Sequence, residues 1–304
     1  MIEETVPGES QSLVNNTSFE VMFYSVIKDR IDELLNDIER YIKSYEEAKP
    51  YPHIVIDNFL PNEIADLILD EFPAADSNIW TKLPTEDQKC KFIAKDESQF
   101  PLKIRALIHE LNSGRFLKFL EKLTGINDLI VDAKIAGGGL HRIEQGGKLS
   151  VHVDFSHHPT NGLNRRINLL LFLNKNWQEE YGGNFELWTW DKGNKKCEKR
   201  VLPIFNRCVI FSTTSTSYHG HPEPLSCPDS ECRKSIALYY FSNGRPAEED
   251  IEHNTLFKTR PNEQTSLGTL LVRAASSGLF RDLMPPILYR NIRKIWNQKF
   301  TVEK

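Results

Sequence analysis

The stretch Ser150-Val151-His152-Val153-Asp154-Phe155 is the part of the chain that decides its fold and chemistry. Polar and apolar residues alternate along it, which is typical of a β-strand with one buried face. Because side chains alternate between the two faces of a strand, His152 and Asp154 point to one side and the two valines to the other. An imidazole beside a carboxylate can provide two ligands to one metal ion, although most His-x-Asp sequences are polar surface pairs. The stretch therefore predicts a strand that carries two candidate metal ligands.

A third ligand has to come from another part of the chain. The best candidates lie in Tyr218-His219-Gly220-His221-Pro222, which follows the apolar run Cys208 to Phe211. Two histidines and one carboxylate on one face of an octahedral ion leave the opposite face open, as in iron(II) oxygenases and unlike closed structural zinc sites. His219 and His221 share a strand face, so both are candidates for this third position.

Arg233 and Ser235 form a second candidate group, 14 residues beyond His219. Alternation along a strand places the two side chains on one face. A guanidinium fork with a hydroxyl group suits the terminal carboxylate of a dicarboxylic acid. Arg233 by itself would be read as a surface arginine, and its position one strand beyond the candidate metal histidine is what makes it a candidate anion-binding residue.

The region from about Leu129 onward has the texture of a β-protein. Short runs with β-like composition are separated by Gly, Pro and Asn, and no helical pattern intervenes, which favours a sandwich or a barrel over an α/β sheet. The expected strands cover residues 130–136, 149–154, 167–173, 184–189, 197–202, 207–212, 218–221 and 234–241.

Helical patterns flank this β-region on both sides. Apolar residues recur at three- and four-residue steps over residues ~18–48, and Pro50 and Pro52 end that pattern. A short strand, 53–56, leads to a helix that begins at Pro61, and another helix is expected at ~101–123. The tail, ~264–300, returns to helix with a break at Pro285-Pro286.

Composition and charge describe an ordinary globular chain. Of 304 residues, 39% are hydrophobic and 26% are charged, the net charge is −4 and the pI is near 6.2. No basic field favours nucleic acid as a partner, and no apolar run reaches the ~20 residues of a membrane helix. The acidic start lacks the order of a signal peptide, and five scattered cysteines favour reduced thiols. We therefore expect a soluble, cytoplasmic protein.

Taken in order, the motifs of residues 51–245 resemble the 2-oxoglutarate/iron(II) dioxygenase superfamily, specifically its prolyl-4-hydroxylase-like branch. They comprise the entry segment 52–61, the pair His152-x-Asp154, the segments 166–174 and 182–188, Phe211-Ser212-Thr213-Thr214, His219-Gly220-His221-Pro222 and Arg233-x-Ser235. The resemblance implies a mainly β fold, in which a double-stranded β-helix (jelly roll) is buttressed by N- and C-terminal α-helices. It divides the chain into an N-terminal helical extension (1–50), the dioxygenase domain (51–245, with its core at about 129–242) and a C-terminal helical extension (246–304).

The same resemblance assigns roles to particular side chains. His152, Asp154 and His219 match the metal triad, which favours His219 over His221, and Arg233 with Ser235 matches the clamp for the co-substrate carboxylate. The strand with Asn168 and Phe172 is implied to line the 2-oxoglutarate pocket. Relatives often have a tyrosine at Phe172, and another about ten residues before the His-x-Asp pair, where this chain has Arg142. The expected substrate contacts are Arg142, Arg165, Arg166, His157 and His221.

The resemblance implies an iron(II)- and 2-oxoglutarate-dependent hydroxylase that uses O2 and releases succinate and CO2. Asp154 argues against a halogenase, which needs an open ligand position in place of the carboxylate. The substrate, an amino acid, a prolyl peptide or a small metabolite such as a sugar, is not determined by fold or metal site. The alternative is a non-catalytic jelly-roll binding module with a vestigial metal site. The terminal helices are candidates for a homodimer interface.

Overall fold

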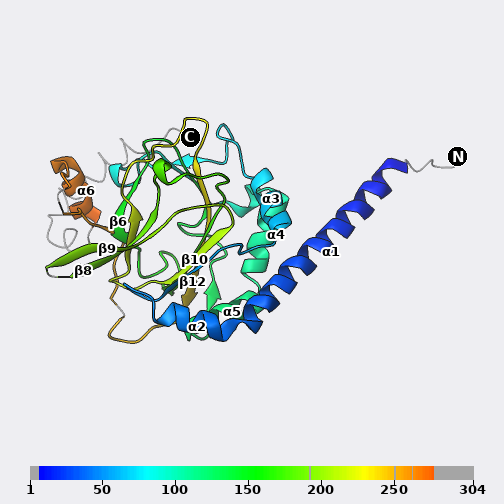
Figure 1. The fold of residues 1–304 in the computed structure, drawn as a ribbon, viewed down its shortest axis with the longest axis horizontal. Coiled ribbons are helices and arrows are strands. Elements are labelled where there is room, and N and C mark those ends of the chain that lie inside the picture. The colour runs from blue at the N-terminus through cyan, green and yellow to red at the C-terminus, as the bar shows by residue number, and fades with distance from the viewer. Residues whose placement is uncertain (1–6, 192, 250, 262, 277–304) are drawn as a thin grey trace.

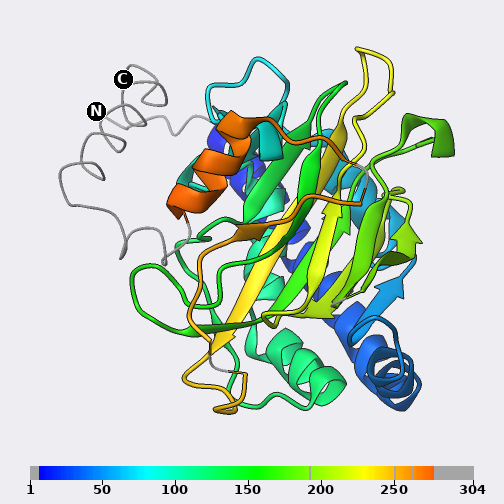
Figure 2. The ribbon, with the colours of Figure 1, turned by 90° about the vertical axis from the view of Figure 1, so that its left-hand side faces the viewer.

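Two antiparallel β-sheets face each other in the structure, a computed structural model that describes residues 7–191, 193–249, 251–261 and 263–276 (Figure 2). The larger sheet has the order β1-β10-β7-β12-β5-β3-β2, with β4 also paired to β12, and the smaller sheet has the order β13-β6-β11-β8-β9. This is the predicted jelly-roll architecture. The strands of the large sheet are β1 (His53–Ile56), β2 (Thr81–Lys82), β3 (Lys91–Ala94), β4 (Ile130–Val131), β5 (Gly139–Ile143), β7 (Asn164–Phe172), β10 (Arg207–Ser212) and β12 (Arg233–Ser242). Those of the small sheet are β6 (Leu149–Val153), β8 (Phe185–Asp191), β9 (Asn194–Val201), β11 (Tyr218–His221) and β13 (Leu256–Phe257).

The central strand β7 separates two hydrophobic clusters. Leu169 and Leu171 are fully buried in the cluster shared with the helices, whereas Leu170 and Phe172 pack in the cluster shared with the smaller sheet. A strand buried on both faces has a continuous apolar sequence, which is why Leu169 to Leu173 shows no alternation of polar and apolar residues. One face of the large sheet therefore packs on helices, and the other faces the site.

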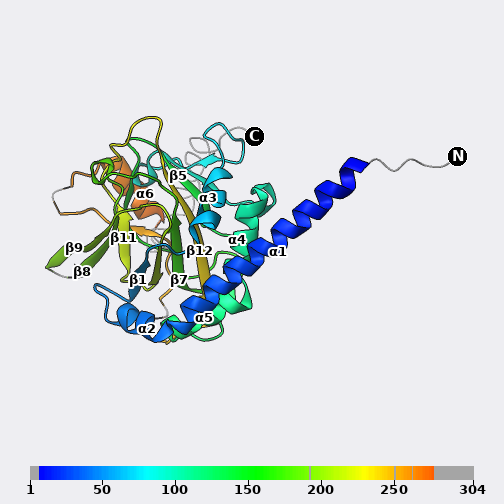
Figure 3. The same ribbon diagram turned by 45° about the vertical axis from the view of Figure 1, so that its right-hand side comes forward.

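The helices of the N-terminal half lie over the outer face of the large sheet, and the C-terminal helix lies on the opposite side of the molecule (Figures 1 and 3). They are α1 (Pro7–Asn36), α2 (Ile38–Glu46), α3 (Asn62–Asp70), α4 (Leu102–Leu111), α5 (Gly114–Thr124) and α6 (Leu267–Ser276). The N-terminal part of α1 extends away from the body. Ser113 caps α5 by accepting a hydrogen bond from the backbone N–H of Phe116, and Gly125 ends it at φ +69°. Within the described part of the chain, no helix combines the length and apolar character needed to cross a membrane.

Most of the expected elements are present, with informative exceptions. The strands at 53–56, 207–212 and 218–221 have the predicted bounds, whereas the strand expected at 130–136 is only Ile130–Val131. The pattern at ~18–48 is two helices, and ~101–123 is also two. The sequence pattern does not predict strands β2, β3, β5 and β13. Of these, β2 and β3 precede the expected core at 129–242 and β13 follows it, so the sheets extend beyond that range on both sides. The tail beyond 276, with Pro285-Pro286, lies outside the described residues.

Candidate metal centre

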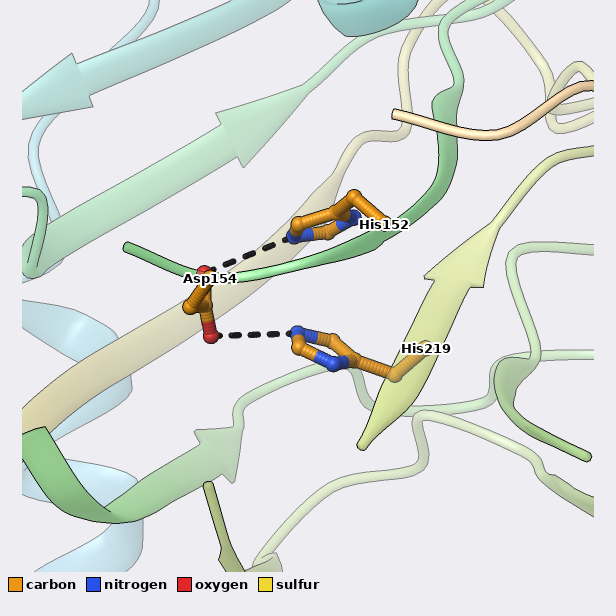
Figure 4. A group of neighbouring side chains, drawn as sticks. All are labelled: His152, Asp154 and His219. Carbon is orange, nitrogen blue, oxygen red and sulfur yellow. Dashed lines mark ion pairs between the residues drawn. The ribbon is translucent and has the colours of Figure 1, made fainter. Parts of the chain in front are cut away.

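His152, Asp154 and His219 meet between the two sheets (Figure 4). One ligand atom from each lies within 4.8 Å of the others, and among the described residues this is the group of His, Cys, Asp and Glu side chains that could hold a metal ion. The Nε2 atoms of His152 and His219 lie 3.5 and 3.3 Å from the two carboxylate oxygens of Asp154. His152 and His219 are directly paired across β6 and β11, which brings residues 67 positions apart in sequence onto one face.

Hydrogen bonds to the backbone orient both imidazole rings. The Nδ1 atoms of His152 and His219 donate to the carbonyls of Ser150 and Ser217, each at 2.9 Å. A carbonyl can only accept, so Nδ1 carries the proton and Nε2 keeps its lone pair toward Asp154. Burial lowers the pKa of His152, with the neighbouring His219 adding to the effect. His152 is therefore held as a neutral imidazole, and both rings present Nε2 to Asp154, the ring nitrogen that is available to bind a metal.

Asp154 is held ionised by the residues around it. Burial by itself would raise its pKa, but Arg165 and the two histidines keep the pKa well below its ordinary value. The Arg165 guanidinium lies 3.1 Å from Oδ2 of Asp154, and the Asn168 amide donates to the same oxygen at 2.8 Å. Asn168 in turn accepts from Nε of Arg165 at 2.9 Å. The donor set of two imidazoles and one carboxylate fits an iron(II) ion with open positions.

A cavity of about 270 Å³ opens beside the triad. Its lining comes from both sheets and includes the triad, Arg165, Asn168, Arg233, Ser235 and His221. The structure thus brings together seven of the side chains expected from the sequence and His221, which was the rival ligand.

Arg233 lies in this cavity, and no anionic side chain pairs with it among the residues that the structure describes. It is 4% exposed, Nε donates to the carbonyl of Gly183 at 2.9 Å, and the Phe172 ring packs 4.8 Å from the guanidinium carbon. Burial lowers the pKa of Arg233 to about 9. A buried cation with free donors fits the far carboxylate of a dicarboxylic acid. Phe172 does not line the cavity, so its position corrects the expected co-substrate contact: the ring supports Arg233 instead.

Gly183 is required for this arrangement. Its φ is +71°, and a Cβ at this position would lie 2.6 Å from Leu225 and 3.0 Å from Cδ of Arg233. Glycine is the residue that accepts both the backbone conformation and the close approach. The sequence pair Gly182-Gly183 therefore positions the carbonyl that orients the Arg233 guanidinium.

His221 lines the cavity but stands outside the metal group. A register shift separates it from His219, and it pairs with Leu149 rather than with a residue of the triad. Both ring nitrogens are buried and have no hydrogen-bond partner within the described part of the chain. Burial, followed by the charge of Arg233, lowers the pKa of His221 well below its ordinary value. The geometry favours His219 as the third ligand and leaves His221 as a neutral polar group in the cavity.

Arg142 lies on the face of β5 opposite the cavity, so the structure gives no support to its expected contact with substrate. Its guanidinium pairs with Glu144 at 2.7 Å and lies 5.3 Å from the Phe92 ring centre. The neighbours His141 and Ile143 line the cavity instead. A shift of one residue reverses the face of a strand residue, so a spacing of "about ten" could not identify which side chain points inward.

Two further expected substrate contacts also lie away from the cavity. Arg166 donates to Ser242 at 3.2 Å on the outer side of β7, and His157 is held in a loop by Ser156 and Asn164, each at 2.9 Å. A register shift between β7 and β12 turns Arg165 inward and Arg166 outward. Arg166 and His157 are therefore not among the residues that line the cavity, and their expected contact with substrate stays a prediction.

Several cavity residues had not been expected from the sequence. Lys91 on β3, Tyr239 on β12, and Thr255 and Phe257 of the C-terminal extension all line the cavity. The Phe257 ring lies 5.3 Å from the His152 ring, and Phe257 pairs with His152 across β13 and β6. The short strands β3 and β13 have too few residues for a clear alternating pattern, and pairing with a distant strand is the signal that identifies them.

Comparisons with known proteins agree with this geometry. Residues 138–241 match the model of the 2OG-Fe(II) oxygenase superfamily. A prolyl 3-hydroxylase of Mus musculus, OGFOD1, is 30% identical over 79 residues, which are 25% of this chain and 14% of that protein. The chain thus matches about a seventh of the length of this curated relative. A solved prolyl hydroxylase from Trichoplax adhaerens, in complex with a hypoxia inducible factor peptide fragment, has a TM-score of 0.51 at 19% identity, over 68% of this chain and 92% of that one.

The fold and the site thus define a jelly-roll protein with a His–Asp–His metal triad. Residues 138–241 match the 2OG-Fe(II) oxygenase superfamily model, and the fold is similar to that of a solved prolyl hydroxylase. The superfamily is named for Fe(II) and 2-oxoglutarate, and the triad and the unpartnered Arg233 fit these two groups.

Proposed function

We propose that this chain is an iron(II)- and 2-oxoglutarate-dependent dioxygenase that hydroxylates a substrate bound at the mouth of the cavity. The proposal rests on one observation: the His152–Asp154–His219 triad and the buried Arg233, which has no acidic partner among the described residues, line the same cavity. A metal site alone would suit several chemistries, but the additional carboxylate receptor matches a dicarboxylic co-substrate. The superfamily match over residues 138–241 supports the same assignment.

Each residue has a physical task in this proposal. His152, Asp154 and His219 would hold iron(II), while Arg165 and Asn168 fix the orientation of Asp154. Arg233 and Ser235 would hold the far carboxylate of 2-oxoglutarate. With O2, iron(II) and 2-oxoglutarate supply an oxidant that hydroxylates a C–H bond as 2-oxoglutarate becomes succinate and CO2. The protein contributes the positioning of the reactants and a cavity that excludes bulk water.

The cavity supports an enzyme over a non-catalytic binding module with a vestigial site. A vestigial site has no reason to keep both histidines oriented and the carboxylate ionised, and all three ligands here are in place. The names of the relatives make prolyl peptides the first substrates to test, with free amino acids and small metabolites as the other classes. A mass gain of one oxygen in a cell extract would identify the product.

Substitution of the triad tests the proposal. We expect His152→Ala and Asp154→Ala to abolish iron-dependent release of succinate from 2-oxoglutarate, because each removes a ligand from a three-ligand site. The measurement is succinate release by protein purified without oxygen, beside the iron content of each variant. His157→Ala is the matched control, since His157 lies outside the cavity, and it should keep wild-type activity. Full activity in the triad variants with unchanged iron content would refute the assignment.

A further inference from the structure

Lys91 is a buried lysine whose ammonium group has no anionic partner. Its side chain lies in the cavity lining, the residue is 7% exposed, and no hydrogen bond or ion pair to Nζ is found in the described part of the chain. Burial lowers the pKa of Lys91 to about 8. Burying an unpaired charge is unfavourable, and such a group is retained where a ligand supplies the missing charge.

The sheet places Lys91 beside the carboxylate receptor. Lys91 pairs with Ile143, and Ile143 pairs with Arg233, so the three residues form one row across β3, β5 and β12. Neighbouring strands are about 4.8 Å apart, which puts the Cα atoms of Lys91 and Arg233 roughly 10 Å apart with their side chains on the same face. Both long side chains can therefore reach one group between them.

The cavity has an excess of positive charge near Lys91 and Arg233, which favours the binding of an anion there. Its lining contains three cationic side chains, Lys91, Arg165 and Arg233, and one carboxylate, Asp154. Arg165 is 3.1 Å from that carboxylate, so Lys91 and Arg233 remain without a counter-charge. His221, whose ring nitrogens have no partner, faces the same two cations from the smaller sheet.

We propose that Lys91 is the second cationic contact of the far carboxylate of 2-oxoglutarate, together with Arg233. The inference rests on the proposed function and deepens it. An ionised carboxylate has about four acceptor positions, and the Arg233 guanidinium, the Lys91 ammonium, the Ser235 hydroxyl and the unpartnered His221 ring can together fill them. Phe172 has no hydroxyl to offer at this place, and Lys91 supplies a stronger, charged donor from a strand outside residues 138–241.

Binding without turnover tests this contact. Protein loaded with zinc in place of iron is titrated calorimetrically with 2-oxoglutarate and with 2-oxobutyrate, which has the same keto-acid end but lacks the far carboxylate. Lys91→Met is expected to weaken 2-oxoglutarate binding at least tenfold and to leave 2-oxobutyrate binding within twofold. Lys91→Arg keeps the charge and should recover most of the affinity. Lys89→Met, an exposed lysine two residues away, is the matched control and should change neither constant.

The outcomes separate the contact from other roles. Unchanged 2-oxoglutarate affinity in Lys91→Met, or an equal loss for both acids, would overturn the proposal. So would a variant that keeps its 2-oxoglutarate affinity and loses affinity for the primary substrate. A structural role predicts a lower melting temperature for Lys91→Met, whereas release of an unpaired buried charge predicts a higher one. A different result would count against the proposed function itself. If the zinc-loaded wild-type protein binds 2-oxoglutarate no more tightly than 2-oxobutyrate, then the protein has no receptor for the far carboxylate.

Discussion

The ammonium of Lys91 links the stability of the ligand-free protein to pH. Arg233 and Arg165 oppose its charge, Asp154 favours it, and the buried histidines around it are neutral, so burial dominates and lowers its pKa from 10.5 to about 8. Below pH 8 the lysine is charged in both the folded and the unfolded chain, so the folded state is destabilised by the full free-energy cost of burying the ammonium group. Between pH 8 and 10.5 the unfolded chain holds more protons at this position, so the contribution of Lys91 to stability rises with pH.

This sign leads to a prediction for Lys91→Met. The variant should be more stable than wild type by on the order of 3 kcal/mol at pH 7, and the difference should disappear as the pH approaches 10.5. Chemical denaturation of the metal-free proteins at pH 7 and at pH 10 measures it, with Lys89→Met as the control. A difference that does not change with pH would mean that packing, rather than charge, sets the effect.

The sequence predicted the direction of some side chains of the site and not of others. His152 and Asp154 lie on a regular strand, where alternation alone assigns their common face, and Arg233 and Ser235 follow the same rule. The side chains of Arg142 and Arg166 face away from the cavity because their direction depends on strand register and on a bulge, and neither can be read from spacing. Lys91 could not be recognised as a site residue before β3 was placed beside β5.

At the scale of elements, the C-terminal extension completes the site. Strand β13 pairs with β6 and brings Thr255 and Phe257 into the cavity wall. The segment is anchored from behind, because Arg273 on α6 forms an ion pair with Asp87 in the 3-10 helix Glu86–Gln88 and donates to Thr259 at 2.7 Å. Asp87 is 4% exposed, so this pair is buried and its loss is expensive.

We therefore expect Arg273→Met to loosen the segment that carries β13. Removing the cation leaves a buried carboxylate without its partner, which costs several kcal/mol and lowers the free energy of local opening. Hydrogen exchange of residues 255–260 should accelerate at least tenfold. Lys175→Met removes a surface ion pair with Asp66, whose side chains are 48% and 46% exposed, and should leave this exchange unchanged. Equal exchange in both variants would show that the anchor does not hold β13.

At the scale of the whole molecule, the N-terminal helices are part of the core rather than an appendage. The side chains Phe23, Ile27, Ile31 and Leu34 on α1 are each no more than 2% exposed and belong to the same hydrophobic cluster as the large sheet. Val21 and Met22, directly before Phe23, are 66% and 51% exposed. The boundary between the extension and the domain, expected at residue 50, therefore does not separate two independent cores.

This packing predicts the behaviour of fragments. The fragment 51–245 should fail to unfold cooperatively, because loss of the four α1 side chains alone removes roughly 6–12 kcal/mol of burial, as much as the whole stability of a typical domain. A chain that starts at residue 21 keeps these side chains and should melt within a few degrees of the full chain. Thermal unfolding followed by circular dichroism compares the two. A cooperative transition of 51–245 near that of the full chain would contradict the shared core.

The local sequence pattern indicated the type of chemistry, and the tertiary structure decided which side chains form the site. The alternation around His152, the order of His219 and Arg233 behind it, and the apolar strands were visible in the sequence because each depends on neighbours two to four residues apart. The choice between His219 and His221, the inward turn of Arg165, and the places of Lys91 and Phe257 in the cavity depend on which distant strands pair and in which register. Register is set by packing across the whole fold, so only the folded chain shows which side chains share the cavity.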